Sequence, residues 1–174
     1  RIEEVLNMNI NLSNNNQHIH FIGIGGISMS GLAEILNYEG FTITGSDIKE
    51  SGITDSLRAQ GIKVSIGQKA ENIEDGTDLV VYTAAVKHDN PEMLAAEAKG
   101  ITVIERATLL GAIMDRYKNS IAVSGTHGKT TTTSMISEII MAAKLDPTIT
   151  VGGILQSING NIRLGSSDYF IAEA

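Results

Sequence analysis

A short loop near the middle of the chain combines the residue types that bind phosphate groups. An apolar run, Ile121 to Val123, leads into a segment with the sequence SGTHGKTT, and a helical stretch follows it. Glycines let backbone N–H groups turn toward an anion, a lysine can reach the outer phosphates of a nucleotide, and a threonine hydroxyl can bind the accompanying Mg²⁺. This order of residue types predicts a phosphate-binding loop between a strand and a helix.

The glycine spacing of this loop is shorter than usual. The common pattern G-x-x-x-x-G-K-[ST] is reduced here to Gly125-x-x-Gly128-Lys129-Thr130. A turn with an incidental lysine is the alternative, but core packing gives no reason for Gly-Lys-Thr at this place. His127, at the loop tip, is as well explained by simple exposure as by a role in binding, and we do not expect it to act as a base. The predicted nucleotide-binding residues are Gly125, Thr126, His127, Gly128, Lys129, Thr130 and Thr131.

Glu173 follows an apolar strand candidate at residues 168–172. In phosphate-loop enzymes an acid at the end of a neighbouring strand positions Mg²⁺, because this hard cation prefers carboxylate oxygen. A solvated glutamate is the alternative, and the presence of Lys129 and Thr130 favours the metal role. We therefore predict that Thr130 and Glu173 are the protein ligands of Mg²⁺.

A second glycine cluster, Gly23 to Gly31, follows the first apolar run and opens a helical stretch. It is similar to the dinucleotide fingerprint G-x-G-x-x-G, although Ser28 stands at the third glycine position. Asp47 ends the next strand candidate, where an acid commonly contacts a ribose. Arg106, at the same predicted edge, could bind a diphosphate or only solvate a helix start. A tight turn with no ligand is the alternative, and both NAD and a uridine diphosphate fit the pattern.

These candidate residues stand on strands that alternate with helices. The pattern predicts strands at 18–22, 41–44, 62–66, 78–82 and 101–104, and helices at 28–37, 54–60 and 91–99. Residues 108–117 are expected to close this unit. Asn90 is expected to cap the helix that begins at Pro91. Such alternation implies an α/β fold with a doubly wound parallel sheet of the Rossmann type, over residues 18–118. Residues 1–17 are interpreted as a loose lead-in.

A second domain is expected to begin at residue 119. The phosphate loop and a helix ending near Lys144 follow its first strand, and the strand at 168–172 continues its sheet. A nucleotide-hydrolase sheet needs further strands and helices to cover both faces. Residues 119–174 are therefore predicted to be the first, incomplete part of a P-loop ATPase-type α/β domain.

Composition excludes several classes of function. Hydrophobic residues make up 42% and charged residues 19% of the 174 residues, as in globular proteins, and the lack of cysteine excludes disulfides. The net charge of −7 disfavours nucleic-acid binding. An apolar run of about 18 residues is missing, so no membrane span is expected. A cytoplasmic protein is the default expectation.

Several motifs together resemble the Mur ligase family. They are FIGIGG at 21–26 with MSG at 29–31, GSD at 45–47, NPE at 90–92 and SGTHGKTT at 124–131. The resemblance implies a three-domain enzyme, of which this chain covers the UDP-sugar domain and the opening of the ATP-binding domain. His127 favours either the branch that adds L-alanine to UDP-N-acetylmuramate or the related ligase that recycles whole peptides, and the complete first glycine motif favours the former. The chain alone is expected to be inactive.

The chemistry that the resemblance implies is ATP-dependent amide-bond formation in peptidoglycan precursor synthesis. ATP would phosphorylate the lactyl carboxylate, and the amine of L-alanine would attack the acyl phosphate. Lys129 would be the catalytic residue that bridges the β and γ phosphates, and Thr130 and Glu173 would hold Mg²⁺. UDP-N-acetylmuramate would bind through Gly25, Gly26, Ile27, Ser28, Ser46, Asp47 and Arg106.

Three other functions fit parts of the pattern. A UDP-sugar or nucleotide-binding module without catalysis would need only the two glycine motifs. The related ligase that recycles muramyl peptides shares most of them. An NAD-dependent oxidoreductase would explain the first motif and Asp47, but Ser28 and the second phosphate loop count against it.

Overall fold

The chain divides into two compact units, one reaching to Leu109 and one spanning Leu110–Ala174. A computed structural model describes residue 12 and residues 14–174. Most of the predicted lead-in, residues 1–11 and 13, therefore lies outside the described residues. The division falls within helix α5 (Arg106–Met114), whereas the sequence analysis placed the domain boundary after residue 118.

The first unit is built on a parallel sheet of five strands. They are β1 (His18–Ile22), β2 (Thr42–Asp47), β3 (Lys63–Ile66), β4 (Leu79–Tyr82) and β5 (Thr102–Glu105), in the order β3-β2-β1-β4-β5. Each neighbouring pair is parallel. This confirms the predicted doubly wound sheet, whose strand order reverses between β1 and β4.

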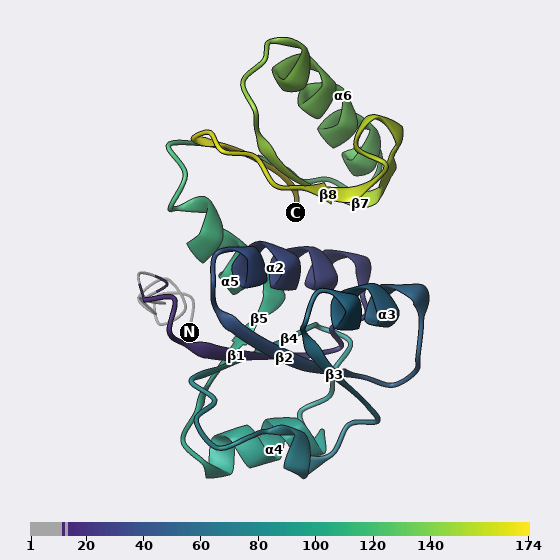
Figure 1. Cartoon of the computed structure of the whole chain (residues 1–174). Helices are drawn as coiled ribbons and strands as arrows, with labels where there is room; N and C mark the ends of the chain where they lie inside the picture. The colour runs from purple at the N-terminus through teal and green to yellow at the C-terminus, as the bar shows by residue number, and fades with distance from the viewer. Residues whose placement is uncertain (1–11, 13) are drawn as a thin grey trace. The chain divides into compact units, whose positions relative to one another are not determined.

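Helices cover both faces of this sheet. Helices α2 (Ile27–Tyr38) and α3 (Gly52–Ala59) lie on one face and α4 (Pro91–Ala98) lies on the other (Figure 1). Asn90 caps α4 as predicted, because its side chain accepts hydrogen bonds from two backbone N–H groups of the first turn. The 3-10 turn η1 (Ala70–Asn72) packs beside α4.

The core of the first unit is centred on β1. Its residues Ile19, Phe21 and Ile22 are completely buried, as expected for a central parallel strand that is covered on both faces. Helix α2 adds Leu32 and Leu36 to this core. Full burial of one such side chain stabilises the fold by about 1.5–3 kcal/mol, so this apolar layer holds the carboxyl edge of the sheet in place.

The second unit contains a mixed sheet with one covering helix. Its elements are β6 (Asn119–Val123), α6 (Lys129–Ala142), β7 (Thr148–Leu155), the 3-10 turn η2 (Gln156–Ile158), β8 (Gly160–Arg163) and β9 (Tyr169–Glu173). The strand order is β6-β9-β7-β8, and only β8 runs antiparallel to its neighbour. Helix α6 packs on the sheet (Figure 1).

The hairpin of β7 and β8 is missing from the sequence analysis, which assigned no strand between 147 and 168. Gly152 and Gly153 interrupt the β-branched run of β7, and the pairing register shifts between Thr150 and Leu155. Glycines weaken a strand pattern and mark irregular pairing. Helix α5 overlaps the segment 108–117 that was expected to close the first unit, and it begins two residues before that segment. Among the described residues, no helix is long and apolar enough to span a membrane.

Candidate functional site

A cavity of about 420 Å³ opens at the carboxyl edge of the first sheet. The residues that line it follow β1, β2, β3 and β4 or begin α4; they are Gly23, Asp47, Ile48, Gln68, Thr83, Ala85, Val86, Lys87, Asp89, Asn90 and Pro91. This edge includes the point where the strand order reverses, and parallel α/β sheets bind ligands there. The cavity is therefore the candidate site for a small molecule in the first unit.

The glycine turn after β1 is fixed by bonds to the end of β2. The N–H groups of Gly23 and Ile24 donate to the carbonyl oxygen of Ser46 at 2.8 and 2.9 Å, and Gly25 N donates to Asp47 Oδ2 at 2.8 Å. A Cβ atom on Gly25 would lie only 2.7 Å from the same carboxylate oxygen. Asp47 therefore lines the cavity and at the same time holds the turn.

The other predicted substrate residues are divided between the surface and the core. Gly26 and Ile27 are exposed at the start of α2. Arg106 Nη1 donates to Ser28 Oγ at 3.0 Å, which places the guanidinium beside the same helix start. The side chain of Ser46 is completely buried and donates to Glu92 Oε2 at 2.6 Å. Ser46 thus lies beneath the edge, and only its carbonyl oxygen takes part in the glycine turn.

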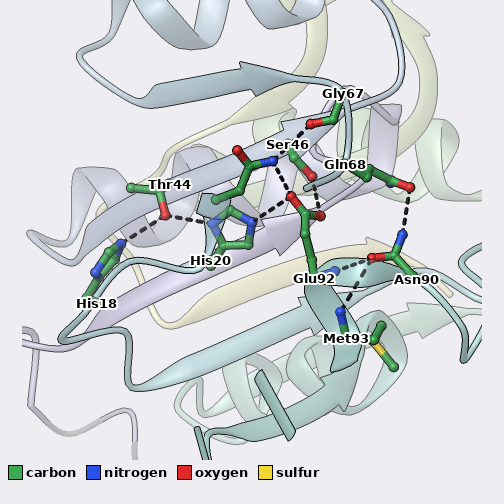
Figure 2. Close-up of polar contacts among 10 residues, drawn as sticks. His18, His20, Thr44, Ser46, Gly67, Gln68, Asn90, Glu92 and Met93 are labelled. Atoms are coloured by element: carbon green, nitrogen blue, oxygen red, sulfur yellow. Dashed lines mark hydrogen bonds and ion pairs between the residues drawn. The ribbon is translucent and has the colours of Figure 1, made fainter. Parts of the chain in front are cut away.

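A buried polar network lies behind the cavity, and the sequence analysis did not identify it. Glu92 and His20 are 0% and 1% exposed, and Glu92 Oε1 lies 3.8 Å from His20 Nε2 (Figure 2). His20 Nδ1 and His18 Nε2 both contact the hydroxyl of Thr44 at 2.9 Å. A hydroxyl has one hydrogen, so it donates to one ring and accepts from the other. Burial lowers the pKa of His18 and favours its neutral form.

The loop that is predicted to bind phosphate lies between β6 and α6, so its expected place between a strand and a helix is confirmed. Gly125 and Gly128 have φ values of +156° and +75°, a region that favours glycine. Gly128 is the N-cap of α6, and because glycine has no side chain, no side-chain oxygen caps this helix. The first N–H groups of a helix lack partners within it and attract anions. Lys129 Nζ donates to the carbonyl oxygen of Gly125 at 2.7 Å and so crosses the loop.

The remaining loop residues differ in their surroundings. Thr126, His127 and Thr131 are exposed. Thr133 is buried and its hydroxyl donates to the carbonyl oxygen of Lys129 at 2.8 Å. The hydroxyl of this threonine is thus used within the helix.

Thr130 and Glu173 are brought together at the end of the loop. Thr130 Oγ1 donates to Glu173 Oε2 at 2.8 Å. The same carboxylate oxygen accepts from Gly152 N at 2.8 Å, a contact from β7 that the sequence analysis missed. A Cβ atom on Gly152 would lie 2.8–2.9 Å from the carboxylate atoms. The paired glycines inside an apolar run are the sequence signal for this close approach.

The oxygen pair formed by Thr130 and Glu173 fits Mg²⁺. Both donors are hard oxygen atoms, and Mg²⁺ is commonly held by one or two protein oxygens together with phosphate and water. Among the described residues, no group of three or more His, Asp or Glu side chains gathers as a metal site. A cation held by Thr130 and Glu173 would complete its coordination with water and phosphate oxygens.

Comparison with known families identifies the family of this chain. The family model described as "Mur ligase family, catalytic domain" matches residues 18–118. The chain belongs to the Mur ligase family. The match covers the glycine turn and the cavity, and it confirms the resemblance seen in the sequence motifs. It favours a ligase over the oxidoreductase alternative.

Relatives of this Mur ligase extend the similarity into the second unit. The UDP-N-acetylmuramate–L-alanine ligase of Agathobacter rectalis is 70% identical over 157 residues, which cover 90% of this chain and 34% of the relative. The chain thus spans about a third of the length of that relative.

Two solved structures have the same fold. One is a UDP-N-acetylmuramate–alanine ligase from Thermotoga maritima, with a TM-score of 0.83, 37% identity, and coverage of 90% of this chain and 36% of that chain. The other is the UDP-N-acetylmuramate:L-alanyl-gamma-D-glutamyl-meso-diaminopimelate ligase from Neisseria meningitides. It has a TM-score of 0.83, 32% identity, and coverage of 91% and 52%.

Proposed function

We propose that this chain is part of an ATP-dependent enzyme that joins L-alanine to UDP-N-acetylmuramate. The observation that carries the proposal is the meeting of Thr130 Oγ1 and Glu173 Oε2 at 2.8 Å beside the lysine of a glycine loop. The 70% identity to a ligase of that name supports the choice of substrates. Because the chain spans about a third of that relative, the complete reaction is proposed for the whole protein.

The proposed reaction has two steps. A carboxylate oxygen of the muramic acid attacks the γ-phosphorus of ATP, and ADP leaves. The amine of L-alanine then attacks the carbonyl carbon of the acyl phosphate, loses a proton and expels phosphate, so an amide bond forms. Both steps depend on positioning and on neutralising phosphate charge.

The residues of the second unit would perform the positioning of ATP. Backbone N–H groups of residues 125–131 would hold the phosphates, and Lys129 would exchange the Gly125 carbonyl oxygen for the β and γ phosphates. Thr130 and Glu173 would hold Mg²⁺, which when bound neutralises phosphate charge. Gly152 N would keep the Glu173 carboxylate in place.

The cavity of the first unit would hold the UDP part of the sugar nucleotide. Ile48 is 76% exposed although it is large and apolar, and it lines the cavity. An exposed apolar side chain at a cavity suits the flat face of a nucleobase. Asp47 would face the uridine, and Gly26, Ile27, Ser28 and Arg106 would face the diphosphate at the start of α2. We infer that an enzyme with these substrates acts in the cytoplasm.

Calorimetric titration of the chain tests both proposed sites. We expect binding of UDP-N-acetylmuramate, and binding of Mg-ATP that is lost in Lys129→Ala. Lys118→Ala is the matched control, because Lys118 is an exposed lysine of the same unit. Equal Mg-ATP binding by wild type and Lys129→Ala would contradict the role of the loop.

The substrate that the complete enzyme requires for phosphate release distinguishes the alanine-adding ligase from the peptide-adding one. The similarity to the Neisseria structure equals that to the Thermotoga structure in TM-score, so the fold of these units does not separate the two activities. We expect phosphate release with UDP-N-acetylmuramate, ATP and L-alanine. Release that requires the tripeptide L-alanyl-γ-D-glutamyl-meso-diaminopimelate instead would identify the other ligase.

A further inference from the structure

Two side-chain amides stand together on the wall of the first-unit cavity. Gln68 follows β3 and Asn90 precedes α4, and both line the cavity. Neither belongs to the glycine turn or to its contacts with Asp47. An amide offers a hydrogen-bond acceptor on one side and two donors on the other. The orientation of these two amides therefore determines which chemical groups the cavity accepts.

The helix cap fixes the orientation of the Asn90 amide. Asn90 Oδ1 accepts from the backbone N of Glu92 at 2.8 Å and of Met93 at 3.4 Å. Backbone N–H groups only donate, so the oxygen must face the helix. The Nδ2 group of Asn90 consequently points the other way and donates to Gln68 Oε1 at 2.6 Å (Figure 2).

The bond from Asn90 also determines which atom of the Gln68 amide faces a ligand. Because Gln68 Oε1 accepts from Asn90, the Nε2 group of Gln68 is the side that is left for a ligand. No hydrogen bond joins Gln68 Nε2 to a residue in the described part of the chain. Gln68 is half-buried on the cavity wall. The cavity therefore presents a pair of N–H donors whose direction is set by the α4 cap.

Glu92 ties together the two segments that carry these amides. Its buried carboxylate accepts from Ser46 Oγ at 2.6 Å and from Asn72 Nδ2 at 2.5 Å, and Asn72 Nδ2 also donates to the carbonyl oxygen of Gly67 at 2.9 Å. The start of α4 is thus bonded to Ser46 in β2, and the residue before Gln68 is linked to Glu92 through Asn72. A buried carboxylate costs several kcal/mol unless such bonds compensate it, so packing alone does not explain Glu92.

We propose that Gln68 is a specificity-determining residue whose Nε2 group donates a hydrogen bond to the 4-oxo group of a uracil base. Asn90 is a positioning residue that orients the amide. The inference rests on the proposed function, which puts a uridine nucleotide in this cavity. Uracil has an acceptor at position 4, whereas cytosine has an amino group there. A fixed donor pair binds the first and repels the second.

The test compares UDP with CDP as probes in calorimetric titrations of the chain. Wild type is expected to bind UDP at least about 10-fold more tightly than CDP. CDP cannot accept the hydrogen bond from Gln68 Nε2, and its amino group is itself a donor that would point at the N–H groups of Gln68. In Gln68→Leu, the affinity for UDP should fall about 10-fold, to that for CDP. In Gln68→Glu, one oxygen still accepts from Asn90 and the other accepts from the cytosine amino group, so the preference should reverse.

Two further variants separate orientation from folding. Asn90→Asp keeps a good helix cap but cannot donate to Gln68, so the ratio of UDP to CDP affinity should fall while circular dichroism and thermal unfolding stay unchanged. Glu97→Gln is the control, because Glu97 is an exposed glutamate of the same helix, and it should keep the wild-type ratio.

The possible results lead to different conclusions. A wild-type chain that binds no UDP would overturn the proposed use of the cavity together with this inference. UDP binding with an unchanged UDP preference in Gln68→Leu would overturn the inference and leave the proposed function standing. Equal loss of UDP and CDP affinity in that variant would show a structural role only and would also overturn it. If Gln68→Leu fails to fold, a retained preference for UDP over CDP in Gln68→Glu would likewise overturn the inference.

Discussion

Substitution of Gly152 by alanine tests whether the position of the Glu173 carboxylate controls Mg²⁺ binding. The new Cβ atom would lie 2.8 Å from Glu173 Oε2 and 2.9 Å from Glu173 Cδ and Oε1. Real Cβ atoms do not approach other atoms so closely, so the carboxylate must move. The N–H group of residue 152 is kept, and the perturbation is therefore steric.

The magnitude follows from the bond that is broken. Gly152 N donates to Glu173 Oε2 at 2.8 Å, and a hydrogen bond to a charged group contributes about 1.5–3 kcal/mol. Because about 1.4 kcal/mol corresponds to a factor of ten in affinity, we expect the affinity for Mg-ATP to fall about 10- to 100-fold. The same lost bond should lower the free energy of unfolding by no more than about 1.5–3 kcal/mol, and Gly152 is exposed, so no core packing is lost with it.

The assay is a calorimetric titration with ATP, in the presence and in the absence of Mg²⁺. Only the gain in affinity that Mg²⁺ provides should shrink in Gly152→Ala, because the loop amides and Lys129 are unchanged. Gly111→Ala is the matched control, since a Cβ atom at Gly111 would meet nothing within 4 Å. An unchanged effect of Mg²⁺ in Gly152→Ala would refute the reasoning, and so would an equal loss in the control.

Two further predictions concern the hydrogen bonds that join Asp146 to Ser166 and Ser167, in the segment after β8. Gly165→Ala should destabilise the second unit by about 3 kcal/mol or more, because its Cβ would lie 2.2 Å from the backbone oxygen of Asp146. Thermal unfolding measures this loss. Gly160→Ala is the control and should change stability little, because a Cβ there would have contacts of 3.9 Å or longer. Hydrogen bonds from Ser166 and the nearby Arg163 hold the pKa of Asp146 far below its usual value. Its stabilising effect is thus complete above about pH 4 and is lost as the pH falls through the lower folded-state pKa. The difference in Tm between wild type and Asp146→Asn should accordingly shrink only below about pH 4, and a constant difference down to pH 3 would contradict this.

The first unit was predictable because each of its elements carries a local signal. Its strands are short apolar runs, and Asn90 with Pro91 marks the start of α4 before any partner is known. The phosphate loop was likewise identified from adjacent residues, and its Gly-Lys-Thr segment does open α6. Such signals depend only on neighbours in the sequence.

The features that escaped prediction depend on residues far apart in the chain. Glu92 bonds to Ser46 across 46 positions, and only the fold shows that this glutamate is buried. The contact between Gly152 and Glu173 spans 21 positions. The β7–β8 hairpin was missed because glycines and the left-handed Asn159 break the alternation that identifies strands.

In the proposed ATP-binding role, the bond from Lys129 Nζ to the carbonyl oxygen of Gly125 would affect which lengths of phosphate chain the loop accepts. A nucleoside monophosphate that reaches only the amides at the start of α6 leaves this internal bond intact and gains nothing from the ammonium group. A triphosphate offers the lysine negatively charged oxygens in exchange for a neutral one. If the loop binds ATP as proposed, it would therefore rank nucleotides by how many phosphates they carry, before any chemical step begins.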